Sequence, residues 1–306
     1  MSVSDNSVAS QHHFIFIGGL HRSGTTALRQ IVQSHPLVSG FCNTGVDEDE
    51  GQFLQDIYPT DAHFGGPGIF GLHSDAHMAE DSPLLPAAKA TLFQKWSPYW
   101  DLSKPFLVEK TPGNLIRSRF LQEIFPNSTF VFITRHPVAC ALATLKWQNR
   151  VSISRIITHW VNCHNILLDD QFYLKRKILL RYEDLCEDPQ TTMINLANYI
   201  GISPDMSVDL LIKNLNDRYL TEWKRGNYRL WCGKDHWKAP LQRWRNLAEN
   251  AYIGKKYERE INSFGYSFKI DSEAESGLIP PQDIGDYLLS GPLSSRGVTH
   301  VKASVS

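Results

Sequence analysis

The chain of 306 residues has few cysteines and no long apolar run. Its five cysteines are odd in number and far apart, with no C-x-x-C pair, which argues against a disulfide framework and a thiolate zinc site. No segment approaches the roughly 20 apolar residues that a membrane-spanning helix needs. The polar N-terminus, MSVSDNSVASQHH, lacks the basic and apolar regions of a secretory signal. We therefore expect a cytoplasmic protein with no membrane span.

An excess of charge of one sign is also lacking, since 31 Lys and Arg residues face 32 Asp and Glu residues. This balance argues against a general nucleic-acid or anionic-membrane binder, although it permits a local basic pocket. The composition is that of an ordinary globular chain, long enough to bury a sizeable core. We expect no nucleic-acid partner, and the composition leaves the oligomeric state open.

Short apolar runs alternate with helical patterns along the chain. The runs that predict strands are FIFI (14–17), PFLVEK (105–110), TFVFIT (129–134) and KILLRY (177–182). The helical patterns occupy 25–34, 84–96, 114–125, 138–148 and 191–201. Continuous apolar runs are typical of strands buried on both faces. The alternation predicts an α/β fold with a central parallel sheet flanked by helices.

The chain divides into three predicted parts. We expect residues 1–12 to be a flexible N-terminus, 13–270 one domain, and 271–306, rich in Ser, Gly and Pro, a loosely ordered tail. Within the domain, residues 40–104 are rich in Gly, Pro, His and aromatics. They predict a long insertion after the first helix, over the sheet edge where substrate loops usually lie. Residues 204–265 are predicted to be mainly helical.

The stretch FIFIGGLHRSGTT (14–26) places a glycine-rich loop between a predicted strand and a helix. Such a loop lets backbone N–H groups and a helix N-terminus converge on an anion. Gly19 and Gly24 are spaced as in G-x-x-x-x-G-K-[ST], but Thr25 takes the place of the lysine. The loop therefore predicts a phosphate site other than that of an ATP-Mg²⁺ kinase. The alternative is a tight turn whose Ser and Thr residues cap the helix.

A second feature is Arg135, which follows the strand TFVFIT where a magnesium-binding Asp would stand in many nucleotide-binding proteins. Ligands of open α/β sheets bind at the carboxyl ends of the strands. An arginine at this place can bind a second phosphate with two hydrogen bonds, whereas on its own it would be a surface residue at a strand end.

Together, HRSGTT (21–26), ITRHPVA (133–139) and RYEDL (181–185) resemble the motifs of the PAPS-dependent sulfotransferases, most closely the bacterial and tyrosylprotein-type branch. The resemblance covers roughly residues 13 to 200. It implies a P-loop-containing nucleotide-binding fold and transfer of a sulfuryl group from 3'-phosphoadenosine 5'-phosphosulfate (PAPS) to a hydroxyl or amine. The product is 3'-phosphoadenosine 5'-phosphate (PAP), no metal is required, and the acceptor is a small molecule, a glycan or a peptide. A donor with separate 5' and 3' groups needs two anion sites, which accounts for the missing lysine.

The resemblance also implies roles for individual residues. The donor-binding residues are expected to be Arg22, Ser23, Gly24, Thr25 and Thr26 at the 5'-phosphosulfate, Arg135 at the 3'-phosphate, and Tyr182 at the nucleotide. Tyr182 has an alternative role as a core tyrosine at the strand end. The family usually has a serine eight residues after the arginine, where this chain has Ala143. Thr144, next to it, is the expected substitute.

Catalysis needs a cation for the leaving oxygen and a base for the acceptor proton. Lys110 lies 25 residues before Arg135, where the tyrosylprotein-type relatives place a catalytic lysine, and Arg22 is expected to share its task. Aligning the family's E-E-x-R with DEGQ selects Glu50 as the base. The alternative is that the acidic run VDEDE is a solvated face or caps a helix. Histidines such as His21 are rival bases.

Two other interpretations remain open at this point. Ala143 and the choice between bases allow a non-catalytic nucleotide-binding or interaction protein on the same scaffold. A P-loop kinase is disfavoured by Thr25. His73 and His77 are spaced i, i+4, but without a third ligand they do not predict a metal site.

Overall fold

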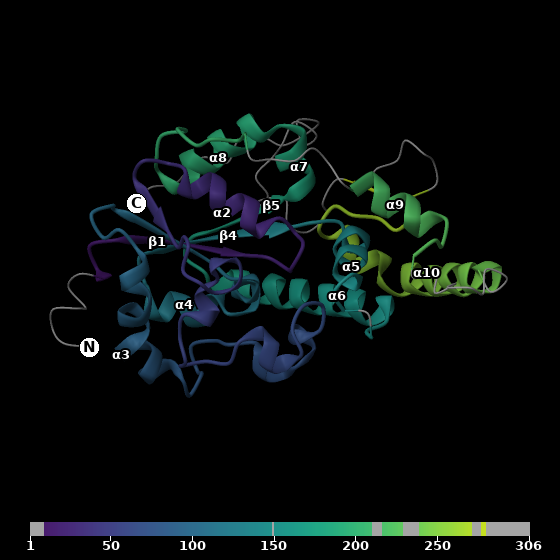
Figure 1. The fold of residues 1–306 in the computed structure, drawn as a ribbon, viewed down its shortest axis with the longest axis horizontal. Helices are drawn as coiled ribbons and strands as arrows, with labels where there is room; N and C mark the ends of the chain where they lie inside the picture. The colour runs from purple at the N-terminus through teal and green to yellow at the C-terminus, as the bar shows by residue number, and fades with distance from the viewer. Residues whose placement is uncertain (1–8, 149, 210–215, 229–238, 271–276, 280–306) are drawn as a thin grey trace.

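The computed structural model describes residues 9–148, 150–209, 216–228, 239–270 and 277–279. Within these ranges the strands form a five-stranded parallel sheet of order β2-β3-β1-β4-β5 (Figure 1). The strands are β1 (His13–Gly18), β2 (Val38–Gly40), β3 (Phe106–Lys110), β4 (Ser128–Thr134) and β5 (Lys177–Arg181). The predicted α/β fold with a central parallel sheet is confirmed. β2 was not predicted, because three residues are too few to leave a pattern.

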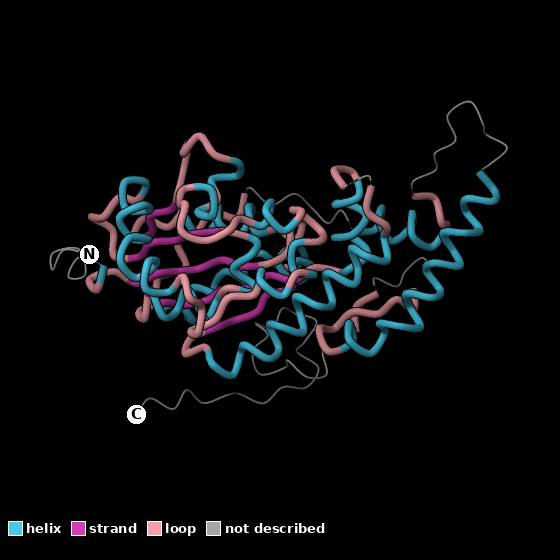
Figure 2. Tube along the Cα trace, turned by 90° about the horizontal axis from the view of Figure 1, so that it is seen from below, coloured by secondary structure: helices cyan, strands magenta, loops and turns pink. Residues whose placement is uncertain are grey.

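Helices cover both faces of the sheet. They are α2 (Thr25–Gln33), α3 (Leu85–Trp96), α4 (Ser118–Ile124), α5 (Pro137–Leu145), α6 (Ile153–Asp170), α7 (Tyr182–Glu187), α8 (Pro189–Ile200), α9 (Asn216–Lys224) and α10 (Ala239–Asn262). In Figure 1, α2, α7 and α8 lie on one face of the sheet, and α3, α4 and α6 lie on the other. Figure 2 shows the long helix α10 extending away from the sheet. Because all five strands are parallel, their carboxyl ends, including those that lead into α2, α5 and α7, lie at one edge of the sheet.

The two faces of the sheet carry different side chains. In β1, Ile15 and Ile17 pack with aliphatic residues of α2 and α8, whereas Phe14 and Phe16 pack with aromatic residues of α3 and α4. All four are buried. Successive side chains of a strand point to opposite faces. The continuous apolar run FIFI is therefore explained by burial on both sides, which stabilises the fold by about 1.5–3 kcal/mol per large side chain.

Several predicted boundaries differ from the structure. The helix predicted over 114–125 is divided into a 3-10 helix, η7 (Pro112–Ile116), and α4, because Arg117 between them has non-helical φ and ψ of −126° and 11°. The strand predicted over 177–182 ends at Arg181, and Tyr182 begins α7. Helix α6 was not predicted at all.

The segment predicted as an insertion, 40–104, contains several short 3-10 helices and α3 between β2 and β3. It packs on the α6 side of the sheet, where Gly71 lies so close to Cys163 that a Cβ on Gly71 would be 2.1 Å from the sulfur. The proposed N-terminal segment 1–12 and tail 271–306 fall mostly outside the described residues. Of the tail, residues 277–279 are described, and Leu278 pairs with Tyr266 in an isolated bridge.

Candidate functional site

The loop after β1 requires glycine at two positions. A Cβ on Gly19 would be 2.4 Å from the Ile133 carbonyl oxygen, so the loop can approach β4 only without a side chain there. Gly24 has a φ of +104°, and a Cβ on it would be 2.7 Å from the Tyr182 ring. Gly24 also occupies the N-cap of α2, where a glycine offers no capping side chain. The first N–H groups of α2 are therefore left for an anion.

The polar side chains of the loop differ in their surroundings. Within the described part of the chain, the buried hydroxyl of Ser23 has no hydrogen-bond partner. The Thr26 hydroxyl donates to Glu48 over 3.0 Å. Arg22 has a φ of +70°, and its guanidinium lies 4.6 Å from the centre of the Trp147 ring. A buried hydroxyl without a partner costs free energy that a bound anion would recover.

Arg135 lies beside this loop, as predicted from its position after β4. Its Nε donates to Asn216 over 2.8 Å and its Nη1 donates to the carbonyl oxygen of Arg22 over 2.8 Å. The guanidinium lies 4.2 Å from the centre of the Tyr182 ring. Its Nη2 is buried and has no partner among the residues that the structure describes. Arg135 thus places a buried, positively charged hydrogen-bond donor next to the loop, and its other bonds hold it in place.

Two residues that sequence reasoning missed hold Arg135 in place. Glu183 accepts from Asn216 Nδ2 over 2.5 Å, and Asn216 in turn accepts from Arg135. Glu183 also accepts from the His136 backbone N–H over 2.9 Å and from the Tyr266 hydroxyl over 2.9 Å. Burial raises the pKa of Glu183. The RYEDL motif contained a signal for Glu183, whereas Asn216 stands in a segment with no motif.

Tyr182 and Thr144 lie in different surroundings. The Tyr182 ring packs between Gly24 and Arg135, so it is a buried tyrosine that also touches both predicted phosphate sites. Thr144 is buried in α5, and its methyl group lies where a Cβ on Gly68 would be 3.0 Å away. Thr144 therefore faces the insertion, and its predicted contact with the donor remains a prediction.

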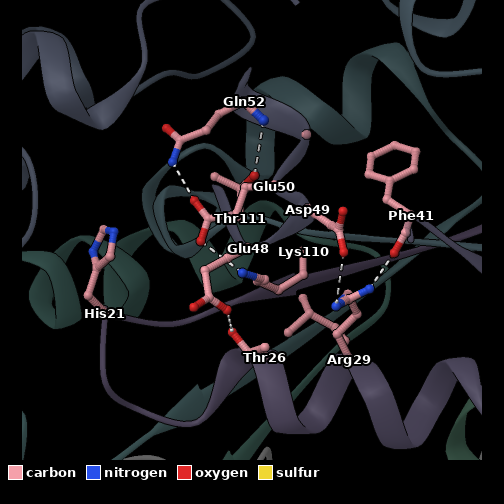
Figure 3. Close-up of polar contacts among 12 residues, drawn as sticks. His21, Thr26, Arg29, Phe41, Glu48, Asp49, Glu50, Gln52, Lys110 and Thr111 are labelled. Carbon is pink, nitrogen blue, oxygen red and sulfur yellow. Dashed lines mark hydrogen bonds and ion pairs between the residues drawn. The ribbon is translucent and has the colours of Figure 1, made fainter. Parts of the chain in front are cut away.

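The acidic run bends back onto α2 and β3. Glu48 and Asp49 both have left-handed φ values, 53° and 51°. Glu48 bonds to Thr26, and Asp49 lies 3.6 Å from Arg29 of α2 (Figure 3). Burial opposes ionisation of Asp49, but hydrogen bonds from Thr44 and the charge of Arg29 lower its pKa. The predicted alternative of a solvated face fits Glu48, which is exposed, but not the end of the run.

Glu50 and Lys110 form a buried ion pair at the end of β3. The Lys110 ammonium lies 2.8 Å from Glu50 Oε1, and both side chains are almost entirely buried, with exposed fractions of 0% and 6%. Glu50 Oε2 accepts from Gln52 Nε2 over 2.7 Å (Figure 3). Because Lys110 pairs with Ile17 of β1, this ion pair lies directly beside the start of the predicted phosphate loop, residues 19–24. The structure thus brings the predicted base and the predicted cation together.

Glu109 fixes the turn that carries Glu50. Its carboxylate accepts from the Gly51 backbone N–H over 2.9 Å, from the Thr111 hydroxyl over 2.6 Å and from Asn114 Nδ2 over 2.6 Å. Burial raises the pKa of Glu109, although these three donors favour its charged form. The backbone of the turn is therefore held by β3 itself.

His21, considered as a rival base, and His77, considered as a metal ligand, are engaged in other contacts. His21 Nε2 lies 2.9 Å from Asp61 Oδ2, and the hydrogen bond and charge of His21 lower the pKa of Asp61 although burial acts in the opposite direction. His77 Nε2 lies 2.9 Å from Asp170 Oδ2. In the ranges described, no group of three or more His, Cys, Asp or Glu side chains could hold a metal ion. No described helix is long and apolar enough to cross a membrane.

Comparison with known proteins gives relatives of one kind. Protein-tyrosine sulfotransferase 2 of Gallus gallus is 24% identical over 197 residues, which cover 62% of this chain and 51% of the relative. Protein-tyrosine sulfotransferase 1 of Danio rerio is 23% identical over 238 residues, covering 68% of this chain and 65% of the relative. The chain thus spans about half to two thirds of the length of these curated relatives.

Among solved structures, the sulfotransferase from Alicyclobacillus acidocaldarius is similar with 17% identity and a TM-score of 0.41, over 68% of this chain and 88% of that one. The model of the Sulfotransferase family matches residues 15–206. This match extends over more than half of the chain and includes the phosphate loop, Lys110, Arg135 and the RYEDL motif. The resemblance seen in the sequence motifs is confirmed: the chain belongs to the sulfotransferase family.

Proposed function

We propose that this protein transfers a sulfuryl group from PAPS to a hydroxyl or amine of a small-molecule, glycan or peptide acceptor, releasing PAP. Besides family membership, one observation carries the proposal. Arg135 Nη2 is a buried donor without a partner in the described residues, and Arg135 Nη1 is bonded to the phosphate loop at Arg22. A buried guanidinium with an open donor favours a phosphate group as its ligand.

The residues present fit a donor with two separated anionic groups. The loop would hold the 5'-phosphosulfate through Ser23, Thr25, Thr26 and the N–H groups at the start of α2. Arg135 would hold the 3'-phosphate, with the Tyr182 ring beneath its guanidinium. When bound, the donor supplies an activated sulfuryl group. No metal ion has a role in this proposal.

In the proposed reaction, Glu50 accepts one proton, and Lys110 and Arg22 stabilise the negative charge on the leaving oxygen. In the resting site the Glu50 carboxylate is neutralised by Lys110. We assign to Glu50 the acceptance of the proton from the acceptor hydroxyl or amine. Once Glu50 is protonated, its attraction to Lys110 weakens, and the ammonium becomes available for negative charge that develops on the leaving oxygen. Arg22, on the exposed side of the loop, would share this task after leaving the Trp147 ring.

Donor recognition is tested by thermal unfolding with ligands. A ligand at 100 times its Kd stabilises the folded state by about 2.7 kcal/mol. PAP should therefore raise the melting temperature clearly more than ADP or ATP with Mg²⁺, because PAP alone among these places phosphates at both anion sites. Equal shifts for the three ligands would contradict the donor assignment, and a preference for ATP with Mg²⁺ would favour a kinase.

Transfer itself is tested by mass spectrometry. The protein is incubated with PAPS and a metabolite extract or a tyrosine-containing peptide library, and products heavier by one SO₃ group are sought. Such products, formed much more slowly by the Lys110→Met variant, would support the proposal and identify the acceptor class. Binding of PAP without any transfer across this panel would instead favour the non-catalytic interpretation.

A further inference from the structure

Gln52 uses both ends of its amide to connect parts of the site. It lies in the 3-10 helix η2 (Gly51–Phe53) and is completely buried. Its Nε2 donates to Glu50 Oε2 over 2.7 Å, and its Oε1 accepts from the Asp61 backbone N–H over 2.9 Å. Its own backbone N–H donates to the Thr111 hydroxyl over 3.2 Å. The side chain is thus held at two points, one of which is the proposed base, and the backbone of the same residue is held at a third.

The orientation of the Glu50 carboxylate is therefore determined from two sides. Lys110 holds Oε1 and Gln52 holds Oε2 (Figure 3). The other charged groups around this turn are directed elsewhere: Glu109 of β3 accepts from the Gly51 N–H, and Glu48 bonds to Thr26. Asp49 pairs with Arg29 of α2, and Asp61 pairs with His21 of the loop.

We infer that Gln52 is a positioning residue for Glu50, an inference that rests on the proposed role of Glu50 as the base. A neutral amide donor bonds to the second carboxylate oxygen and fixes its direction while adding no charge of its own. Lys110 does not do this alone, because its ammonium bonds to Oε1 and Gln52 provides the bond to Oε2. Through its bond to Asp61, Gln52 also ties this orientation to the segment that contacts the phosphate loop through His21.

The test compares Gln52→Met with a matched control, Gln55→Met. Both substitutions replace an amide by a side chain of similar length in the same segment. Gln55 bonds to backbone groups, donating to the carbonyl oxygens of Gln52 and Tyr58 and accepting from the N–H groups of Ile57 and Tyr58. Gln55→Met therefore removes hydrogen bonds near Glu50 without removing one to Glu50 itself.

For Gln52→Met we expect kcat to fall about tenfold or more, the equivalent of a lost hydrogen bond to a charged group. The acceptor KM and the PAP-induced shift in melting temperature should change little. The acidic limb of the kcat–pH profile should move to higher pH, because the carboxylate loses a donor that favours its charged form. Gln55→Met should lower the melting temperature while leaving this limb in place.

An acidic limb that stays in place in Gln52→Met, with kcat equal to that of Gln55→Met, would overturn the inference. If Gln52→Met does not fold, Gln52→Glu provides the measurement, since it retains the length and an acceptor for the Asp61 N–H. It places a second carboxyl group beside Glu50, so the limb should move further toward high pH. Failure of the proposed base is recognised separately: Glu50→Gln would then retain wild-type turnover, whatever the Gln52 variants show.

Discussion

The two halves of the site differ in how completely their polar groups are already bonded. On the donor side, the buried Ser23 hydroxyl and Arg135 Nη2 have no partners in the described chain. On the other side, Glu50 is bonded at both oxygens, to Lys110 and to Gln52. Buried polar groups without partners are costly, whereas a fully bonded network holds its geometry. Binding of an anion would therefore be favoured on the proposed donor side, whereas the Glu50 carboxylate already has a bond at each oxygen before any ligand binds.

Because the two sides differ in this way, substitutions on one side should affect nucleotide binding and substitutions on the other should affect turnover. Substitutions on the proposed donor side should chiefly weaken nucleotide binding, because Ser23 Oγ and Arg135 Nη2 have no partner in the described free protein and so are available to an anion. Substitutions in the Glu50–Lys110 pair should reduce turnover and also destabilise the free protein, because they remove contacts that exist already.

The largest effect is expected for Lys110→Met. Turnover should fall about 100- to 1000-fold, as for the loss of one group that stabilises charge in a transition state. Stability should also fall by about 3–5 kcal/mol, because the substitution leaves Glu50 as a buried carboxylate without its cation. Urea unfolding and steady-state kinetics measure the two effects, and the PAP-induced shift in melting temperature should remain.

The double variant Lys110→Met with Glu50→Gln serves as the control. Removing both charges should recover most of the lost stability, since no unpaired buried charge remains, while turnover stays low. Turnover that recovers along with stability would mean that the pair is structural, and the contrast between the two sides would then be lost.

The second effect is expected for Arg135→Met. Affinity for PAP should fall about 100-fold, in line with the loss of charge-assisted hydrogen bonds to a phosphate. With saturating PAPS, kcat should be close to that of the wild type. Isothermal titration calorimetry gives the affinity, and Arg218→Met on neighbouring α9, which removes an exposed pair with Glu222, is the control. A large fall in kcat with unchanged PAP affinity would reverse the assignment of the two sides.

The smallest effect is expected for Asp61→Asn, which alters the contact between Asp61 of the insertion and His21 of the loop after β1. The pKa of Asp61 is held below its ordinary value, so the carboxylate stabilises the folded state fully above the unfolded pKa of about 3.9 and less as the pH falls below it. At pH 7 the variant should be less stable by about 1 kcal/mol. Urea unfolding measures the free energy of unfolding of both proteins. The difference between wild type and variant should become smaller as the pH is lowered from 4 toward 2. A difference that is independent of pH would exclude the charge as its cause.

Much of the fold was predictable because its cause is local. The strands β1, β4 and β5 are buried on both faces and so appear as continuous apolar runs. The predictions failed where packing decides the backbone. The helix predicted over 114–125 is interrupted at Arg117, whose guanidinium is buried against the Tyr58 ring of the insertion. No pattern within 114–125 contains that contact.

The same distinction applies to the site. Arg135 and Lys110 could be placed because both follow or end strands of one parallel sheet, and such positions meet at one edge. Gln52 could not be recognised, because its role depends on a turn in which Glu48 and Asp49 adopt left-handed conformations. Asn216 reaches Arg135 from a helix far along the chain, so only the three-dimensional arrangement reveals it.

The contact of Tyr182 with both Gly24 and Arg135 has a consequence for selectivity. The ring lies between the loop and Arg135, and the hydrogen bond from Arg135 Nη1 to the Arg22 carbonyl oxygen joins the two directly. The two proposed anion sites are therefore joined through Tyr182 and the Arg22 carbonyl, and the scaffold sets the distance between them. A nucleotide would be chosen by the separation of its phosphates across the ribose, so that molecules of equal charge with all phosphates on one carbon would fill one site and leave the other empty.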